Sequence, residues 1–219
     1  MGVPVGESAG VESVPATLAL RPALLLALCA GALLPFALAP FDLAPLAPLS
    51  FALVLAALRG RSVREALLVG WVLGLGRYGV GVSWVYVSIH EHGNASVLLA
   101  GLLVALFVAF MALFPALAAA AFAALRARTA AGAVLAFTGC QLGLEWLLTW
   151  FLTGFPWLFA GHTQLHWPLA GWAPVLGALG VTLFTVLTGG ALWALWHDRG
   201  RSAGVRVLAA AALLVWLAG

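Results

Sequence analysis

Two aromatic stretches hold the residues best suited to chemistry in this chain of 219 residues. The first covers residues 83–93 and reads SWVYVSIHEHG; its candidate site residues are Trp84, Tyr86 and His90. The second covers residues 152–157 and reads LTGFPW; its candidates are Gly154, Phe155 and Trp157. Both stretches close an apolar segment. They therefore predict two aromatic, polar rims where helices leave a bilayer, on the same side of it.

His90, Glu91 and His92 do not predict a metal site. Neighbours along a helix point in different directions, and no third ligand stands at a recognisable spacing. The two cysteines, Cys29 and Cys140, lie inside apolar segments, which excludes a disulfide framework and a CxxC site. We expect no metal and no other cofactor.

The composition predicts an all-α, polytopic membrane protein. Apolar residues make up 64% of the chain and charged residues 8%, against about 25% in soluble domains. Apolar segments lie near 22–39, 44–58, 65–88, 95–125, 130–151, 172–196 and 205–219. We expect about seven membrane segments, the last truncated, because its 15 residues fall short of the ~20 that span a bilayer.

The arginines predict the orientation, because basic residues collect in short cytoplasmic loops. Nine of the ten flank the first segment or fill every second loop: Arg21, Arg59, Arg61, Arg64, Arg126, Arg128, Arg199, Arg201 and Arg206. This places the N-terminus in the cytoplasm, with residues 1–20 as a disordered tail and 21–219 as the transmembrane domain. No basic stripe with stacking aromatics accompanies them, so we expect no nucleic-acid partner.

Arg77 and Glu145 are charged residues inside apolar segments, where an unpaired charge costs at least ~2.5 kcal/mol. Helical rise puts them about 20 and 26 Å from the arginines at their own segment ends, so their depths are compatible with a pair. The alternative is that Arg77 extends toward water in a cavity while Glu145 is neutral and hydrogen-bonded. The sequence leaves both open.

Three further features concern the shape of the bundle. Five glycines make the segment near 65–88 a packing hub or a bent helix: Gly70, Gly74, Gly76, Gly79 and Gly81. The 95–125 segment is too long for one perpendicular crossing and should be tilted or broken near Pro115. The long apolar loop 152–171 should lie back on the membrane surface or plug a cavity.

Four motifs together resemble the apolipoprotein N-acyltransferases. SWVYVSIHEHG, LTGFPW with the Gly-x-Thr-Gln after it, Ala-Pro-Phe-Asp at 39–42 and Pro-Leu-Ala-Gly at 168–171 occur in the same order in that family. The chain resembles its N-terminal membrane portion over nearly all of residues 20–219. The resemblance implies transfer of a phospholipid acyl chain to an enzyme cysteine, as a thioester, and then to the amino group of a diacylglyceryl-cysteine at the start of an apolipoprotein. It also implies the bacterial inner membrane.

The resemblance implies that catalysis belongs to a periplasmic nitrilase-like domain with a Glu-Lys-Cys triad, which would follow residue 219. This chain contains no lysine, so we expect no catalytic residue in it and no activity from it alone. Cys140 has no base beside it in sequence and is not predicted to be a nucleophile. Two positions depart from the family pattern: Leu148 replaces the arginine three residues after Glu145, and His162 is unusual in its place.

For the aromatic residues the resemblance implies a role in lipid access. Trp157, Trp84 and Tyr86 would line the mouth through which the phospholipid donor and the lipoprotein acceptor enter, while an interfacial aromatic belt is the alternative. His90 would bond to a head group or to the missing domain, or simply be solvated. The main rival function is a small transporter or channel, whose polar path could include only Arg77 and Glu145; a structural scaffold comes third.

Overall fold

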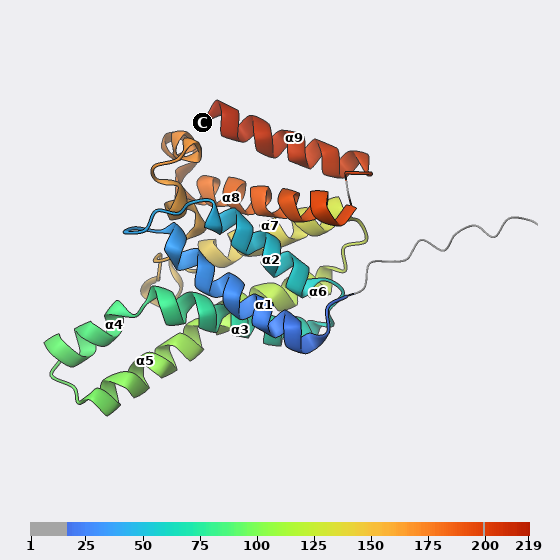
Figure 1. The fold of residues 1–219 in the computed structure, drawn as a ribbon. Coiled ribbons are helices and arrows are strands. Elements are labelled where there is room, and N and C mark those ends of the chain that lie inside the picture. The colour runs from blue at the N-terminus through green and yellow to red at the C-terminus, as the bar shows by residue number, and fades with distance from the viewer. Residues whose placement is uncertain (1–16, 199) are drawn as a thin grey trace, which may run out of the picture.

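The computed structural model describes residues 17–198 and 200–219, and within those ranges every regular element is helical (Figure 1). The α-helices are α1 (Leu20–Leu33), α2 (Leu46–Leu58), α3 (Val63–Gly81), α4 (Trp84–Val87), α5 (Val97–Met111), α6 (Leu113–Leu125), α7 (Ala130–Leu147), α8 (Ala173–Asp198) and α9 (Ala203–Ala218). Short helices are η1 (Leu34–Ala37), the π-helical η2 (Ser88–His92), η3 (Phe151–Thr153), η4 (Ala160–Gln164) and η5 (Pro168–Trp172). The predicted all-α class is confirmed. Most of the predicted tail, and Arg199, lie outside the described residues.

The predicted number of about seven membrane segments is not confirmed by helix length and apolar composition within residues 17–198 and 200–219. In the described part of the chain, four stretches are long and apolar enough to cross a membrane: Leu20–Ala37, Val97–Leu125, Ala130–Leu147 and Pro168–Asp198. A fifth exists if α3 and the helical stretch Trp84–His92 form one span. These two stretches are bent by 56° relative to each other. The apolar helices α2 and α9 have only 13 and 16 residues. Seven spans are thus not confirmed, because hydropathy windows also count apolar residues in turns, such as Ala44 and Pro45 before α2.

Close backbone contacts make α3 the packing hub that its glycines predicted. A Cβ on Gly76 would lie 2.3 Å from the carbonyl oxygen of Leu28 in α1, and one on Gly74 would lie 2.5 Å from Ala112 Cα. Gly79, by contrast, has open space where its Cβ would be. The bend predicted as the alternative is also present, just beyond the helix end.

The long 95–125 segment is broken where it was expected to be. α5 ends at Met111 and α6 begins at Leu113, with Ala112 as the joint. Pro115 explains the position, because it has no N–H to donate to the carbonyl four residues earlier and its ring crowds that carbonyl.

The bundle has two chemically different ends (Figure 1). At one, here called the arginine end, lie the turns at 59–62 and 126–129 and residues 200–202. At the other, the aromatic end, lie residues 38–45, the projecting hairpin of α4, η2 and α5, and the loop 148–172. The common end of these arginine turns agrees with the predicted topology. Which end faces the cytoplasm stays a prediction.

Candidate functional site

Glu145 is the centre of a buried polar network near the aromatic end. Its side chain in α7 is 1% exposed and accepts three hydrogen bonds. Arg77 Nη2 of α3 lies 3.2 Å from Oε1, the Ala160 N–H of η4 lies 2.8 Å from the same oxygen, and the Thr182 hydroxyl of α8 lies 2.6 Å from Oε2. The ion pair that the sequence left open is therefore formed. It satisfies the carboxylate and joins α3, α7, α8 and the loop.

The same network fixes the long loop to the bundle. Arg77 also donates to the Leu158 carbonyl, and the Gly161 N–H donates to Thr182 Oγ1 at 2.9 Å. A Cβ on Gly161 would lie 2.2 Å from the Ala178 carbonyl oxygen, so the loop passes directly over α8. Of the two expectations for this loop, its buried η4 portion fits a plug in the bundle.

Gln164 links this buried part of the loop to the backbone just before α2. The side chain is 0% exposed, and its Nε2 donates to Thr163 Oγ1 at 2.9 Å and to the Ala44 carbonyl at 3.4 Å. Thr163 in turn donates to the Ala160 carbonyl at 2.6 Å. The Gly-x-Thr-Gln motif thus has a structural explanation: a close approach at the glycine and two buried polar links.

The two aromatic stretches meet at one point. The rings of Trp84 and Trp157 lie edge to face, 5.8 Å between centroids, and the two side chains are 48% and 56% exposed. Phe155 turns inward instead, with its ring 6.3 Å from Tyr78 and 5.4 Å from Phe107. Gly154 permits this reversal, since its φ is +86° and a Cβ there would lie 2.5 Å from the Thr149 carbonyl oxygen.

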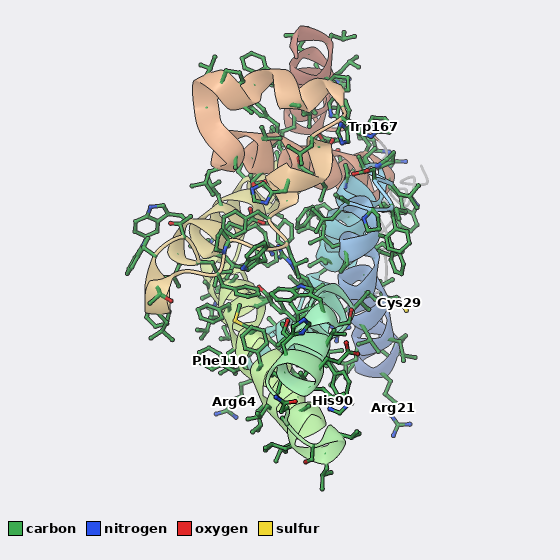
Figure 2. All side chains as sticks on the ribbon, turned by 90° about the vertical axis from the view of Figure 1, so that its left-hand side faces the viewer. Arg21, Cys29, Arg64, His90, Phe110 and Trp167 are labelled. Atoms are coloured by element: carbon green, nitrogen blue, oxygen red, sulfur yellow. The ribbon has the colours of Figure 1, made fainter. Side chains whose placement is uncertain are left out.

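Tyr86 and His90 belong to the hairpin and not to this contact. Their rings are 5.5 Å apart, and His90 Nδ1 lies 2.8 Å from the Ala95 carbonyl oxygen, which spans the turn between η2 and α5. Figure 2, viewed from the aromatic end, places His90 on the hairpin and Trp167 far from it, and the Trp167 ring pairs with Trp216 of α9. His90 thus has a structural partner, and a functional role for it remains a prediction.

Two buried residues of the site were missed by the sequence analysis. Thr182 is 0% exposed, yet a threonine in an apolar helix gives little signal, because its hydroxyl usually bonds within its own helix. Tyr78 is also 0% exposed, and Arg77 Cζ lies 5.9 Å from its ring centre. Tyr78 directly follows Arg77 in an apolar segment, and this position is the signal by which it could have been added to the candidate site residues.

The two charged residues inside the apolar helices are both engaged in this network. Arg77 and Glu145, on which the transporter alternative depended, are bonded to each other and to the loop. Within residues 17–198 and 200–219, no group of three His, Cys, Asp or Glu side chains is placed to hold a metal ion. What the arrangement can do is hold an aromatic rim rigidly at one end of a membrane bundle.

Comparison with known proteins points to one family. Residues 30–191 match the apolipoprotein N-acyltransferase N-terminal domain. The apolipoprotein N-acyltransferase of Pseudomonas aeruginosa is 51% identical over 173 residues, covering 78% of this chain and 34% of the relative. That of Pseudomonas syringae is 47% identical over 200 residues, covering 90% and 40%, and that of Coxiella burnetii is 44% identical over 174 residues, covering 78% and 36%. The chain spans about a third of the length of the curated relatives it matches.

Proposed function

Because the chain belongs to the apolipoprotein N-acyltransferase family, matching its N-terminal domain, we propose that it is the membrane part of an enzyme that acylates lipoproteins. The complete reaction would move an acyl chain from a phospholipid to the N-terminal diacylglyceryl-cysteine of an apolipoprotein. The present residues would anchor the enzyme and admit both lipid substrates. The observation that carries this role is the Trp84–Trp157 contact, held over a buried ion pair at one end of the bundle.

The rim is suited to lipid access by its position and its rigidity. Trp157 lies within the loop and directly precedes Leu158 and Ala160, where Arg77 and Glu145 bind the loop backbone, so its indole is held at a defined place although it is half exposed. Tryptophan combines an apolar body with an N–H donor and favours the interface between head groups and acyl chains. A lipid that passes this edge would meet a preformed aromatic wall.

The hairpin beside the rim presents an apolar surface. Leu98, Leu102 and Leu106 of α5 are 83%, 55% and 59% exposed, and Figure 1 shows the hairpin standing away from the other helices. Such a surface needs acyl chains or another apolar partner around it. We propose that lipid reaches the rim from the membrane along this hairpin.

The chemistry itself would depend on residues outside this chain. Cys140 lies in α7 and is half buried, and Cys29 faces outward from α1 (Figure 2). Neither has the adjacent base that thiol nucleophiles use. The proposed catalytic triad would belong to a nitrilase-like domain on the periplasmic side, with the arginine end in the cytoplasm and the protein in the bacterial inner membrane.

A chimaera tests the proposal directly. This chain would replace the matching N-terminal third of the Pseudomonas aeruginosa relative, and the purified chimaera would receive phospholipid and a diacylglyceryl-cysteine peptide. We expect acylated peptide at a rate within about tenfold of the relative's own, because the residues that align between the two proteins would position the same substrates. A folded chimaera that leaves the peptide unacylated would contradict the proposed role.

A further inference from the structure

A cavity of about 430 Å³ lies at the arginine end, opposite the aromatic rim. Four arginines line it: Arg59 and Arg61 from the turn after α2, and Arg126 and Arg128 from the turn after α6. Among its described lining residues there is no aspartate or glutamate. Topology alone requires arginines somewhere near these helix ends, but it does not require two separate turns to direct them into one cavity.

Three of these arginines carry charge that the described part of the chain does not neutralise. Arg61 is engaged, since it donates to the Leu18 and Ala19 carbonyls and lies 3.7 Å from Glu65. No ion pair within residues 17–198 and 200–219 involves Arg59, Arg126 or Arg128. Arg59 is also half buried, and this burial lowers the pKa of its guanidinium. A partly desolvated cation without a carboxylate favours an anionic ligand.

The start of α7 adds to this positive field. Thr129, the N-cap, and Ala130 and Ala133 of the first turn line the same cavity. The N-terminal end of a helix of 18 residues carries a partial positive charge and N–H groups that favour an anion. The cavity therefore presents both guanidinium groups and a helix end to a single ligand.

A second, mainly apolar cavity of about 640 Å³ adjoins the first between α1, α2 and α8. Its apolar lining includes Leu18, Leu26, Leu53, Ala56, Leu195 and Trp196. Both cavities share Arg59, Trp193 and His197, and the Trp193 and His197 rings are stacked 5.1 Å apart. An apolar groove thus begins at the arginines and continues along the membrane-facing helices.

We propose that these joined cavities bind one anionic glycerophospholipid at the arginine end. Its phosphate would lie among Arg59, Arg126 and Arg128, and one acyl chain would lie in the groove beside Leu26 and Leu53. Bidentate guanidinium contacts suit a phosphodiester, and basic pockets between membrane helices bind such head groups. The site is separate from the aromatic rim, does not depend on the proposed acyl transfer, and would tie α1, α2, α7 and α8 together.

Native mass spectrometry of the 219-residue chain in a non-ionic detergent tests the site. Phosphatidylglycerol, cardiolipin, phosphatidylethanolamine and glycerol 3-phosphate would be titrated separately, and bound molecules counted. We expect one tightly bound anionic lipid, with phosphatidylethanolamine and glycerol 3-phosphate each at least about tenfold weaker, because one lacks the net charge and the other lacks the chain. Equal binding of phosphatidylethanolamine would overturn the proposal, and so would binding of glycerol 3-phosphate as tight as that of phosphatidylglycerol, which would indicate a free-anion site.

Two sets of variants distinguish a specific lipid site from a general attraction of anionic lipid to the basic end of the protein. Arg126→Gln with Arg128→Gln should weaken phosphatidylglycerol binding about 25-fold, at roughly fivefold for each arginine. Arg21→Gln with Arg64→Gln removes the same charge from the same end but outside both cavities, and should change binding less than about twofold. Ala56→Phe, which fills the groove, should weaken lipid binding but leave glycerol 3-phosphate unchanged. Equal effects of the two arginine pairs, in variants of unchanged helicity, would refute the site.

Discussion

The Arg77 guanidinium lies 3.2 Å from the Glu145 carboxylate, which comes 68 residues later in the chain, and neither side chain is more than 4% exposed. Removing one partner leaves the other buried and charged, which typically costs about 3–5 kcal/mol. We expect Glu145→Gln to lower the free energy of unfolding by about that much. Chemical denaturation in detergent, followed by far-UV circular dichroism, measures it.

The double variant Arg77→Met with Glu145→Gln is the control for this pair. It removes both charges, so its loss should be smaller than the sum of the two single losses by about 1–3 kcal/mol. Strict additivity of the two substitutions would show that the residues are not coupled and would reject the pair as a stabilising element.

Thr182 provides a second test of the network, with a matched control in the same helix. Thr182→Val removes the donor to Glu145 and the acceptor of the Gly161 N–H, and should destabilise the protein by about 1–3 kcal/mol. Thr185 is equally buried, but its hydroxyl donates only to the Val181 carbonyl of its own helix, so Thr185→Val should cost about 1 kcal/mol or less. Equal unfolding midpoints for the two variants would mean that the loop is not held through Thr182.

Two glycines of α3 should respond to alanine in opposite ways. Gly76→Ala puts a Cβ 2.3 Å from the Leu28 carbonyl oxygen, and we expect a loss of about 1–3 kcal/mol from overpacking. Gly79→Ala meets open space and should be neutral or stabilising by up to about 1 kcal/mol through helix propensity. Thermal unfolding of both variants decides the matter, and a tolerated Gly76→Ala would contradict the close α1–α3 packing.

The sequence predicted the all-α class of this fold, whereas its predicted number of spans is not confirmed. Composition and apolar runs are enough for an all-α membrane bundle, and Pro115 alone located the break between α5 and α6. Hydropathy does not register where a helix starts, however. Apolar turn residues such as Ala44 and Pro45 extended predicted segments beyond the 13-residue helix α2.

The charged residues of the candidate site could be predicted from the sequence, whereas its uncharged polar residues could not. Arg77 and Glu145 are conspicuous because charges are rare in apolar helices, and their depths agreed. Thr182 and Gln164 become important only through contacts between helices and loop that no spacing reveals. That Trp84 and Trp157 touch depends on the bend after α3 and the reversal at Gly154, which are tertiary features.

The isolated chain should have no acyltransferase activity, because it contributes no activated nucleophile. The purified 219-residue protein would be incubated with phospholipid and a diacylglyceryl-cysteine peptide, and the products separated by mass spectrometry. The complete Pseudomonas aeruginosa relative, assayed alongside, shows that the substrates are competent. Acylated peptide formed at the relative's rate would place the catalytic groups within these residues. It would refute the proposal that they lie outside this chain.

Trp157 should contribute to turnover without contributing to folding. Its indole is 56% exposed and meets Trp84 edge to face, so Trp157→Ala removes little buried surface but opens the rim. An aromatic contact to the lipid worth about 1 kcal/mol in the transition state corresponds to about fivefold in kcat/KM, so we expect a loss of that size. In the chimaera, Trp157→Phe should retain most of the rate.

Trp150→Ala is the matched control, since Trp150 is 53% exposed and pairs with Trp146 instead, 5.3 Å away. Equal rates for Trp157→Ala and Trp150→Ala would assign both to the aromatic belt, because a belt residue anchors the protein in the membrane without touching the substrate.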